Sequence, residues 1–210
     1  SAGQSFGAFG IKGLKLILEG DANDYVAKGL SGASISIKLP KDSKLISDQN
    51  TIIGNTVLYG ATSGNLFASG KAGERFAVRN SGATTVIEGC DSNGCEYMTG
   101  GSVVILGQVG DNFAAGMTGG MAFIYDEKVE LEKKINPETV VFQRVETEYW
   151  KNFLKNLIQK HFEETNSKIA EKIISNYKNE ISYFYQVCPK EMLDKLDNPI
   201  TIKDKINIAI

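Results

Sequence analysis

The chain has 210 residues, of which 42% are apolar and 23% are charged, and its formal net charge is −2. This composition is typical of a soluble globular protein with one or two domains. The small net charge excludes the strong positive field that attracts nucleic acid phosphates. No apolar run approaches the roughly 20 residues that cross a bilayer. We therefore expect neither a nucleic acid nor a membrane as a partner.

The sequence contains three cysteines, Cys90, Cys95 and Cys188. An odd and sparse set is a poor basis for a disulfide framework, and the spacing is not the CxxC pattern of a zinc site. We expect buried or incidental thiols in a reducing compartment. The predicted location is the cytoplasm, or the plastid stroma if the source is eukaryotic.

Glycine divides the chain into two parts. All 22 glycines precede residue 121, whereas the remainder is rich in Lys and Glu and has periodic apolar residues. We predict one domain over residues 1–126. A linker and an α-helical tail follow over residues 127–210, and the tail is expected to pack on that domain or to cap it.

An internal repeat runs through residues 1–126. Residues 98–106 (MTGGSVVIL) recur as residues 117–125 (MTGGMAFIY), at an offset of 19. Glycines also head comparable segments, and the offsets between successive ones are 19, 22, 19, 9, 18 and 19, so one offset breaks the register. These glycines are Gly13, Gly32, Gly54, Gly73, Gly82, Gly100 and Gly119.

The third and fifth residues after most of these glycines are apolar, which is the pattern of short strands with one buried face. The pairs are Leu16/Leu18, Ile35/Ile37, Val57/Tyr59, Phe76/Val78, Val103/Ile105 and Ala122/Ile124. Short strands in coils of about 19 residues predict a mainly β fold, a right-handed parallel β-helix whose stacked coils share one core. We expect glycine at its corners, since glycine adopts positive φ without steric cost.

The tail is predicted to be helical. From Thr147 onward, apolar residues that include Trp150, Leu154 and Ile158 recur at helical spacing. A second helix is predicted from Ser167 through Tyr185, ending at Cys188 and Pro189, and a short third helix then runs through Leu196. These amphipathic helices need an apolar surface, either one another or the open end of the solenoid.

Candidate catalytic groups are few. The single histidine, His161, lies within the apolar stripe of the first tail helix, and no Ser or Cys nucleophile is evidently placed beside it. We interpret it as a packed or hydrogen-bonded side chain. A set of charged residues has two interpretations, a polysaccharide-cleaving site or a surface for docking and internal pairing, and we favour the second. The set is Glu19, Asp21, Asp24, Glu74, Arg75, Arg79 and Glu88.

Five segments carry a specific resemblance. They are residues 1–9 (SAGQSFGAF), 20–26 (GDANDYV), 54–62 (GNTVLYGAT), 72–82 (AGERFAVRNSG) and 94–101 (GCEYMTGG). Together they resemble the C-terminal domain of glutamate synthase large subunits, and residues 140–157 and 187–189 resemble it more loosely. One departure is Ser92-Asn93, where the resemblance leads us to expect Asp-His.

The resemblance implies the last large domain of a flavoprotein that converts glutamine and 2-oxoglutarate, with reducing equivalents, into two glutamates. It implies an architectural element without catalytic, cofactor or metal sites. FMN and an iron–sulfur cluster would lie in other domains. The implied partners are the amidotransferase and FMN-binding domains, with a small reductase subunit as a further one. Since the chain opens within a family motif at Ser1, we expect an excised domain or a separately encoded subunit.

The candidate structural or docking residues are accordingly Gly32, Gly54, Gly73, Glu74, Arg75, Arg79, Gly100 and Gly119. Two alternatives remain open at this point. One is a β-helical subunit of another redox complex, similar to the C subunit of formylmethanofuran dehydrogenases. The other is a β-helical polysaccharide lyase or hydrolase.

Overall fold

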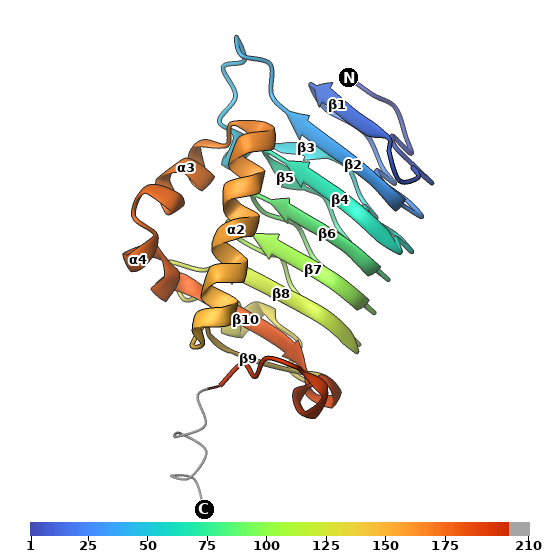
Figure 1. The fold of residues 1–210 in the computed structure, drawn as a ribbon. Helices are drawn as coiled ribbons and strands as arrows, with labels where there is room; N and C mark the ends of the chain where they lie inside the picture. The colour runs from blue at the N-terminus through green and yellow to red at the C-terminus, as the bar shows by residue number, and fades with distance from the viewer. Residues whose placement is uncertain (202–210) are drawn as a thin grey trace, which may run out of the picture.

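Parallel strands dominate the computed structural model, which describes residues 1–201 (Figure 1). Six strands lie side by side in chain order in one sheet, and each pairs with the next in parallel. They are β1 (Lys15–Glu19), β2 (Ser31–Lys38), β4 (Ser63–Ala68), β6 (Ser81–Ile87), β7 (Thr99–Ile105) and β8 (Gly119–Tyr125). The predicted parallel β-solenoid is confirmed. Residues 202–210 of the predicted tail lie outside the described residues.

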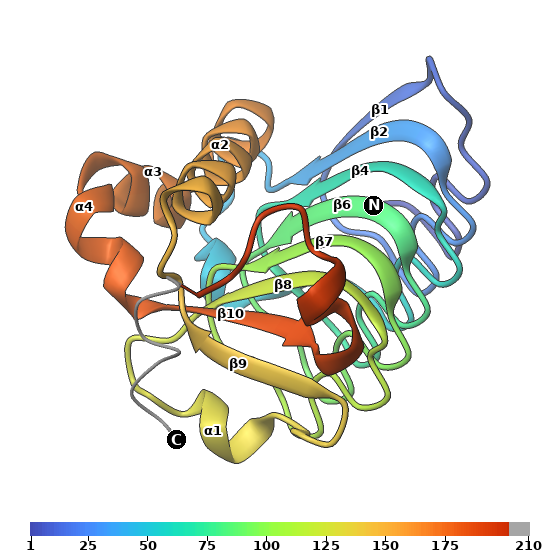
Figure 2. The same cartoon turned by 60° about the horizontal axis from the view of Figure 1, so that its bottom comes forward.

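Each coil has three sides, which stack along the molecule (Figure 2). The sheet strand is the first side. The second is a short extended segment, where β3 (Thr51–Ile53) pairs in parallel with β5 (Lys71–Ala72) and isolated bridges link Ala22 to Ile53 and Ala72 to Cys90. The third side is a tight five-residue turn. We call these turns the arcs, and they comprise residues 5–9, 25–29, 56–60, 75–79, 93–97 and 112–116.

The arcs have an unusual backbone. In every arc the first, third and fifth residues are left-handed, with φ between 52° and 69°, and only four of these positions are glycine. The prediction that glycine makes the corners is therefore wrong for most of them. A left-handed conformation costs a non-glycine residue about 1–2 kcal/mol. Hydrogen bonds between neighbouring coils offset this cost.

The arc of residues 75–79 bonds to both neighbouring coils. The N–H groups of Arg75 and Arg79 donate to carbonyls of the next coil, those of Ser92 and Glu96, at 2.9 and 3.0 Å. The N–H of Ala77, between them, donates 3.0 Å to the carbonyl of Val57 in the preceding coil. Alternate left-handed residues thus aim successive N–H groups in opposite directions. The stack satisfies backbone donors that a lone turn would leave to water.

Two of the predicted strand segments are arcs instead. Val57 and Tyr59 lie in one arc, and Phe76 and Val78 lie in the next. The arcs bury consecutive residues, Val57 and Leu58 in one and Phe76 to Val78 in the next. Their apolar residues resemble those of a buried strand in sequence, so the pattern alone does not separate the two conformations. The sheet strand that follows the arc of residues 56–60 is β4, which begins at Ser63 and buries Leu66.

Several glycines of the repeat allow neighbouring coils to approach each other closely. Gly82, Gly100 and Gly119 lie at the start of strands and do not have positive φ. A Cβ at these positions would lie 2.0, 2.3 and 2.0 Å, respectively, from a backbone carbonyl oxygen of the preceding coil. The spacing between stacked coils therefore excludes any side chain at these positions.

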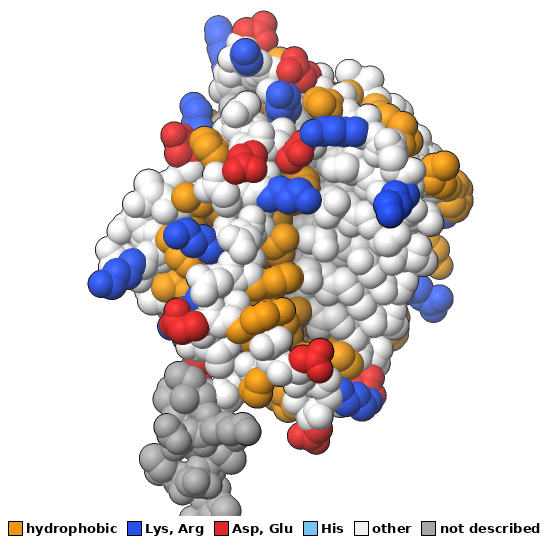
Figure 3. Space-filling model, in the orientation of Figure 1, with side chains coloured by type: hydrophobic (Ala, Val, Ile, Leu, Met, Phe, Trp, Pro, Cys, Tyr) orange, Lys and Arg blue, Asp and Glu red, His pale blue; other side chains and the backbone are white. Residues whose placement is uncertain are grey.

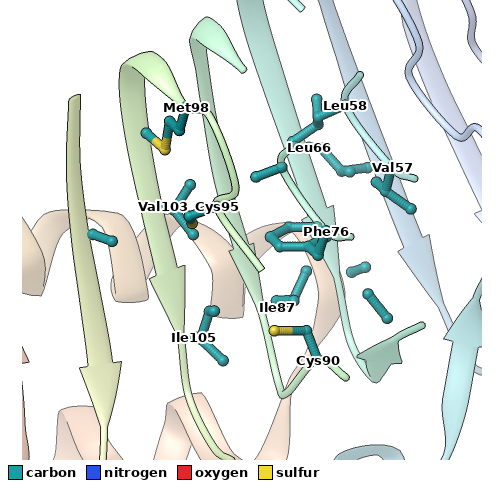
Figure 4. Close-up of a cluster of buried hydrophobic side chains, with 14 of the residues drawn as sticks. Val57, Leu58, Leu66, Phe76, Ile87, Cys90, Cys95, Met98, Val103 and Ile105 are labelled. Carbon is teal, nitrogen blue, oxygen red and sulfur yellow. The ribbon is translucent and has the colours of Figure 1, made fainter. Parts of the chain in front are cut away.

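The solenoid interior is a continuous apolar core (Figure 4). Phe76, Cys90 and Cys95 point into it from the second and third sides, and Leu66 and Val103 meet them from the sheet. All five are at most 3% exposed. Each coil alone would expose this face, so the stack supplies its own core.

One coil carries an insertion. Across the sheet, Leu16 pairs with Ile35 and Leu66 pairs with Thr85, an offset of 19 in both cases. Ile35 pairs with Leu66, however, at an offset of 31. The additional segment between β2 and β4 projects as a loop at the top of Figure 1, and it includes the 3₁₀ turn η1 (Ser47–Gln49). We call residues 39–50 the insert loop.

The predicted first tail helix is confirmed as α2 (Glu148–Thr165). It crosses the outer face of the sheet, where its buried residues Leu154 and Ile158 join a second apolar cluster with Phe67, Val104 and Phe123 (Figure 1). In the same orientation, a stripe of hydrophobic side chains follows α2 (Figure 3). The second helix, α3 (Lys168–Ser175), has Ser167 as its predicted N-cap, and the Ser167 Oγ accepts from the Ala170 N–H at 3.2 Å.

The second tail helix is shorter than predicted. It ends at Ser175, and α4 (Tyr177–Glu180) and the 3₁₀ turn η2 (Ile181–Tyr183) follow it. Residues predicted to be helical then form β10 (Phe184–Pro189), antiparallel to β8 and to β9 (Val140–Arg144). The physical reason is that β8 would otherwise present an unpaired edge. The short third helix is the 3₁₀ segment η3 (Lys190–Lys195).

The C-terminal end of the stack is closed. The short helix α1 (Leu131–Lys134) follows β8, and Leu131, Ile135 and Val140 are buried in the interior cluster. The N–H of Phe113, in the last arc, donates 2.9 Å to the carbonyl of Lys134. This segment therefore takes the place of a further coil.

Candidate functional site

The outer surface of the arcs holds the predicted charged docking residues. Arg75 and Arg79 are both exposed on the same arc. The Arg75 guanidinium lies 3.2 Å from the Glu96 carboxylate of the next arc. Arg79 forms no ion pair with any described residue, and with Tyr97 and neighbours from the last two coils it lines an open groove of about 420 Å³. Tyr97 is 52% exposed.

The predicted glycines Gly54 and Gly73 make room for polar contacts beside the arcs. Asp24 Oδ1 accepts from the N–H of Asn55 at 2.8 Å, and Asn55 Oδ1 accepts from the N–H of Glu74 at 2.9 Å. A Cβ at Gly54 would lie 2.3 Å from that Asp24 oxygen, and one at Gly73 would lie 2.3 Å from the Asn55 oxygen. These glycines therefore support the stacking of the arcs.

The departure at Ser92-Asn93 has a structural role in this chain. Ser92 Oγ accepts from the Asp111 N–H at 3.2 Å. Asn93 Oδ1 accepts from Asn112 Nδ2 at 2.9 Å, and Asn112 Oδ1 accepts from Asn136 Nδ2 at 3.0 Å. Three amides thus form a ladder over successive layers of the stack. Its only sign in the sequence is the offset of 19 between the first two.

The seven predicted charged residues do not form one site. Glu19 at the end of β1 pairs with Lys38 at 3.5 Å, Asp21 and Asp24 follow β1, and Glu74, Arg75 and Arg79 belong to the arc side. Glu88, by contrast, is 1% exposed. Gly32, with φ 115°, lies at the start of β2 against Lys12. The arrangement is that of an exposed polar surface with a separate buried carboxylate.

Glu88 belongs to a buried polar cluster beneath the helices. It follows β6 on the outer face of the sheet, where its Oε1 accepts from Ser167 Oγ at 2.5 Å and lies 3.8 Å from His161 Nε2. The side chains of Glu88 and His161 are fully buried, and both ring nitrogens of His161 lack a hydrogen-bond partner among the described residues. The cluster joins the α2–α3 junction to the sheet. Nothing in the spacing of residues 88, 161 and 167 predicts it.

Burial alone would raise the pKa of the Glu88 carboxyl, but the neighbouring His161, Ser167 and Ser47 outweigh it and hold this pKa below its usual value. Glu88 is therefore an acceptor, charged at neutral pH. The Ser167 hydroxyl donates to Glu88 rather than to His161, so the three groups do not have the order of a serine nucleophile with its base. The expected packed role of His161 agrees with this geometry.

The cysteines are separated from solvent. Burial raises the pKa of the Cys90 thiol to about 12 and that of the Cys188 thiol to about 11. A thiol in this state is a poor nucleophile and a poor metal ligand. Within residues 1–201, no three His, Cys, Asp or Glu side chains gather as they would around a metal ion. None of the described helices has the length and apolar composition to cross a membrane.

Comparison with known proteins adds the following findings. The GXGXG motif family model matches residues 1–190. The chain is 58% identical, over 99% of its length, to the glutamate synthase [NADPH] large chain of Azospirillum brasilense, and 51% identical, over 98%, to the glutamate synthase [NADH] of Schizosaccharomyces pombe. It is 50% identical, over 92%, to ferredoxin-dependent glutamate synthase 2 of a Synechocystis strain. It spans only 14%, 10% and 12% of these relatives.

Proposed function

Because the chain belongs to the GXGXG motif family, we propose that it is a structural domain of a glutamate synthase and holds the catalytic domains of that enzyme in place. The observation that carries the proposal is the similarity over almost the whole chain to one segment of glutamate synthase large chains. The reaction of the whole enzyme would be L-glutamine plus 2-oxoglutarate plus two electrons and two protons, giving two L-glutamates.

The construction of the solenoid supports a holding role. The hydrogen bonds of each inner arc run to both neighbouring coils, as at Arg75, Ala77 and Arg79, so one coil does not tilt without breaking bonds on two sides. Reactions that join two substrates depend on a fixed distance and orientation between the reacting groups. A stack with one continuous core provides rigid outer faces for this purpose.

The proposed partners are the other parts of the same enzyme. They are an amidotransferase domain that releases ammonia from glutamine, and a domain with FMN and an iron–sulfur cluster that uses it. A small reductase subunit is a further proposed partner. In this chain the groups proposed for contact are on the arc surface, where Arg79 and Tyr97 line the open groove.

Reconstitution tests the proposal. The purified chain is mixed with a large chain of the Azospirillum brasilense enzyme that lacks the matching segment, and complex formation is followed by light scattering together with glutamine-dependent glutamate synthesis. We expect a one-to-one complex and restored synthesis. Full synthesis without the chain, or a complex without any gain in synthesis, would contradict the proposal. An Arg79→Glu variant should bind more weakly than a Lys12→Glu variant, which changes an exposed charge elsewhere.

A further inference from the structure

The insert loop forms one wall of a cleft that the repeat alone would not produce. The opposite wall is the α2–α3 junction, and the cleft holds about 620 Å³. Insertions into single repeats of a solenoid commonly form its binding face. This insertion raises the offset between paired strand residues from 19 to 31, and it projects over the end of the sheet strands (Figure 1). The cleft is therefore separate from the arc surface.

The lip of the cleft is apolar. Leu45 and Ile46 of the insert loop are 55% and 56% exposed, and Ile169 and Tyr125 contribute on the opposite side and the floor. Adjacent aliphatic side chains that remain exposed beside a concave surface are typical of an interaction site. Leu45 and Ile46 both line the cleft.

The walls of the cleft are basic. Lys41 and Lys44 on the insert loop face Lys168 and Lys172 on α3 across the cleft, and none of the four forms an ion pair with a described residue. Charged side chains of both signs cover the projecting loop at the top of Figure 3. With Lys38, five lysines line the cleft against three acids, Glu19, Asp48 and Glu127. The chain as a whole has a net charge of −2, so this local excess of positive charge is opposite in sign.

Lys168 lies at an electrostatically unfavourable position. It is the first residue of α3, where the helix dipole already places partial positive charge and a basic side chain is unfavourable. The N-cap Ser167 already donates to the buried Glu88 carboxylate, so an acidic group bound in the cleft would interact mainly with the lysine side chain. Lys168 therefore makes α3 less stable than a neutral or acidic residue would, at a position that lines the cleft.

We propose that this cleft binds an acidic polypeptide segment with apolar anchors. Its carboxylates would contact the four lysines, and its apolar side chains would pack between Leu45 or Ile46 and Ile169. The proposal deepens the docking function proposed above and rests on it for the identity of the natural partner. The chemistry of the cleft, however, can be tested on its own.

The test uses the purified chain and a labelled peptide of Glu and Leu in amphipathic helical order, with fluorescence polarisation as the readout. Matched peptides carry Lys or Gln in place of Glu. We expect the Glu peptide alone to bind, and its affinity to fall with rising salt. K168E/K172E and L45S/I46S should each weaken binding about tenfold or more, as expected from losing about 1.4 kcal/mol. K12E/K133E, the same charge change at exposed sites outside the cleft, should leave binding unchanged.

Equal binding of the three peptides, or binding that neither cleft variant weakens, would overturn the proposal. Peptides tiled along the rest of the Azospirillum brasilense large chain then search for the natural segment, which is expected among the acidic ones. The two proposals fail separately. If reconstitution succeeds but no acidic peptide binds, only the proposal for the cleft is contradicted. If the acidic peptide binds at the cleft but reconstitution fails, only the proposed structural role in glutamate synthase is contradicted.

Discussion

The contact between stacked coils and the contact of the helical layer with the sheet are both buried, but different interactions form them. Between coils, backbone approaches backbone beside the apolar core, and glycines such as Gly100 and Gly119 leave no space for a side chain. In the helical layer, Leu154 and Ile158 pack against aromatic and aliphatic side chains of the sheet. The contact between coils therefore requires glycine, which has no side chain, whereas the contact of the helical layer requires large apolar side chains.

The largest expected effect is at Gly119. In Gly119→Val, a Cβ would fall 2.0 Å from the Thr99 carbonyl oxygen, so backbone has to move. We expect the free energy of unfolding to fall by more than about 4 kcal/mol, beyond ordinary over-packing, measured by urea unfolding. The control is Gly3→Ala, where nothing lies within 4 Å of the new Cβ. A Gly119 variant as stable as this control would show that the coils separate easily.

Shortening a buried side chain in the helical layer should lower the free energy of unfolding less than Gly119→Val does. Leu154 is fully buried under α2, so Leu154→Ala should lower the free energy of unfolding by about 3 kcal/mol through lost contacts and a cavity. Asn156→Ala, on the exposed side of the same helix, is the control. If hydrogen exchange shows that Leu154→Ala releases α2 while the sheet stays protected, the two regions unfold separately. Uniform loss of protection would instead show a single cooperative unit.

The buried polar cluster should make the stability difference between the wild type and a Glu88 variant depend on pH. The folded-state pKa of Glu88 is lowered, so the charged form stabilises the fold above the ordinary value of 4.5, and this contribution is lost as pH falls through the folded pKa. Glu88→Gln should lower the free energy of unfolding by about 2 kcal/mol at neutral pH, because the Ser167 hydroxyl loses a charged acceptor. Below pH 4.5 the wild-type and variant stabilities should converge. A constant gap across that range would exclude the charge of Glu88 as the cause.

The smallest expected effect is on the arc surface. Arg75→Ala removes an ion pair to Glu96 in which the Arg75 side chain is about half exposed and the Glu96 side chain is 15% exposed. The pair is worth about 1 kcal/mol, so the midpoint of thermal unfolding should change little. Lys12→Ala, at an exposed residue without an ion pair in the described chain, provides the comparison. A loss as large as that of Leu154→Ala would show that the arc surface supports the fold rather than serving contact.

The sequence predicted the regions that repeat. An offset of 19 and paired apolar residues indicated the stacked coils, and helical spacing indicated α2. It misplaced the arcs, because left-handed turns at Val57 and Phe76 bury residues much as strands do. It also missed β10, since Phe184 and Tyr185 suit a helical stripe and only the free edge of β8 decides their conformation. The Glu88 cluster and the insert-loop cleft arise from long-range contacts that no local pattern records.

Closure of the stack by α1, β10 and β9 ends the run of parallel strands beyond β8. Strands in a sheet lie about 4.8 Å apart, so six parallel strands span about 24 Å, and the reversal of direction at β10 prevents further parallel coils at that end. Adding or deleting one complete repeat would therefore change the span of this sheet in whole steps of about 4.8 Å.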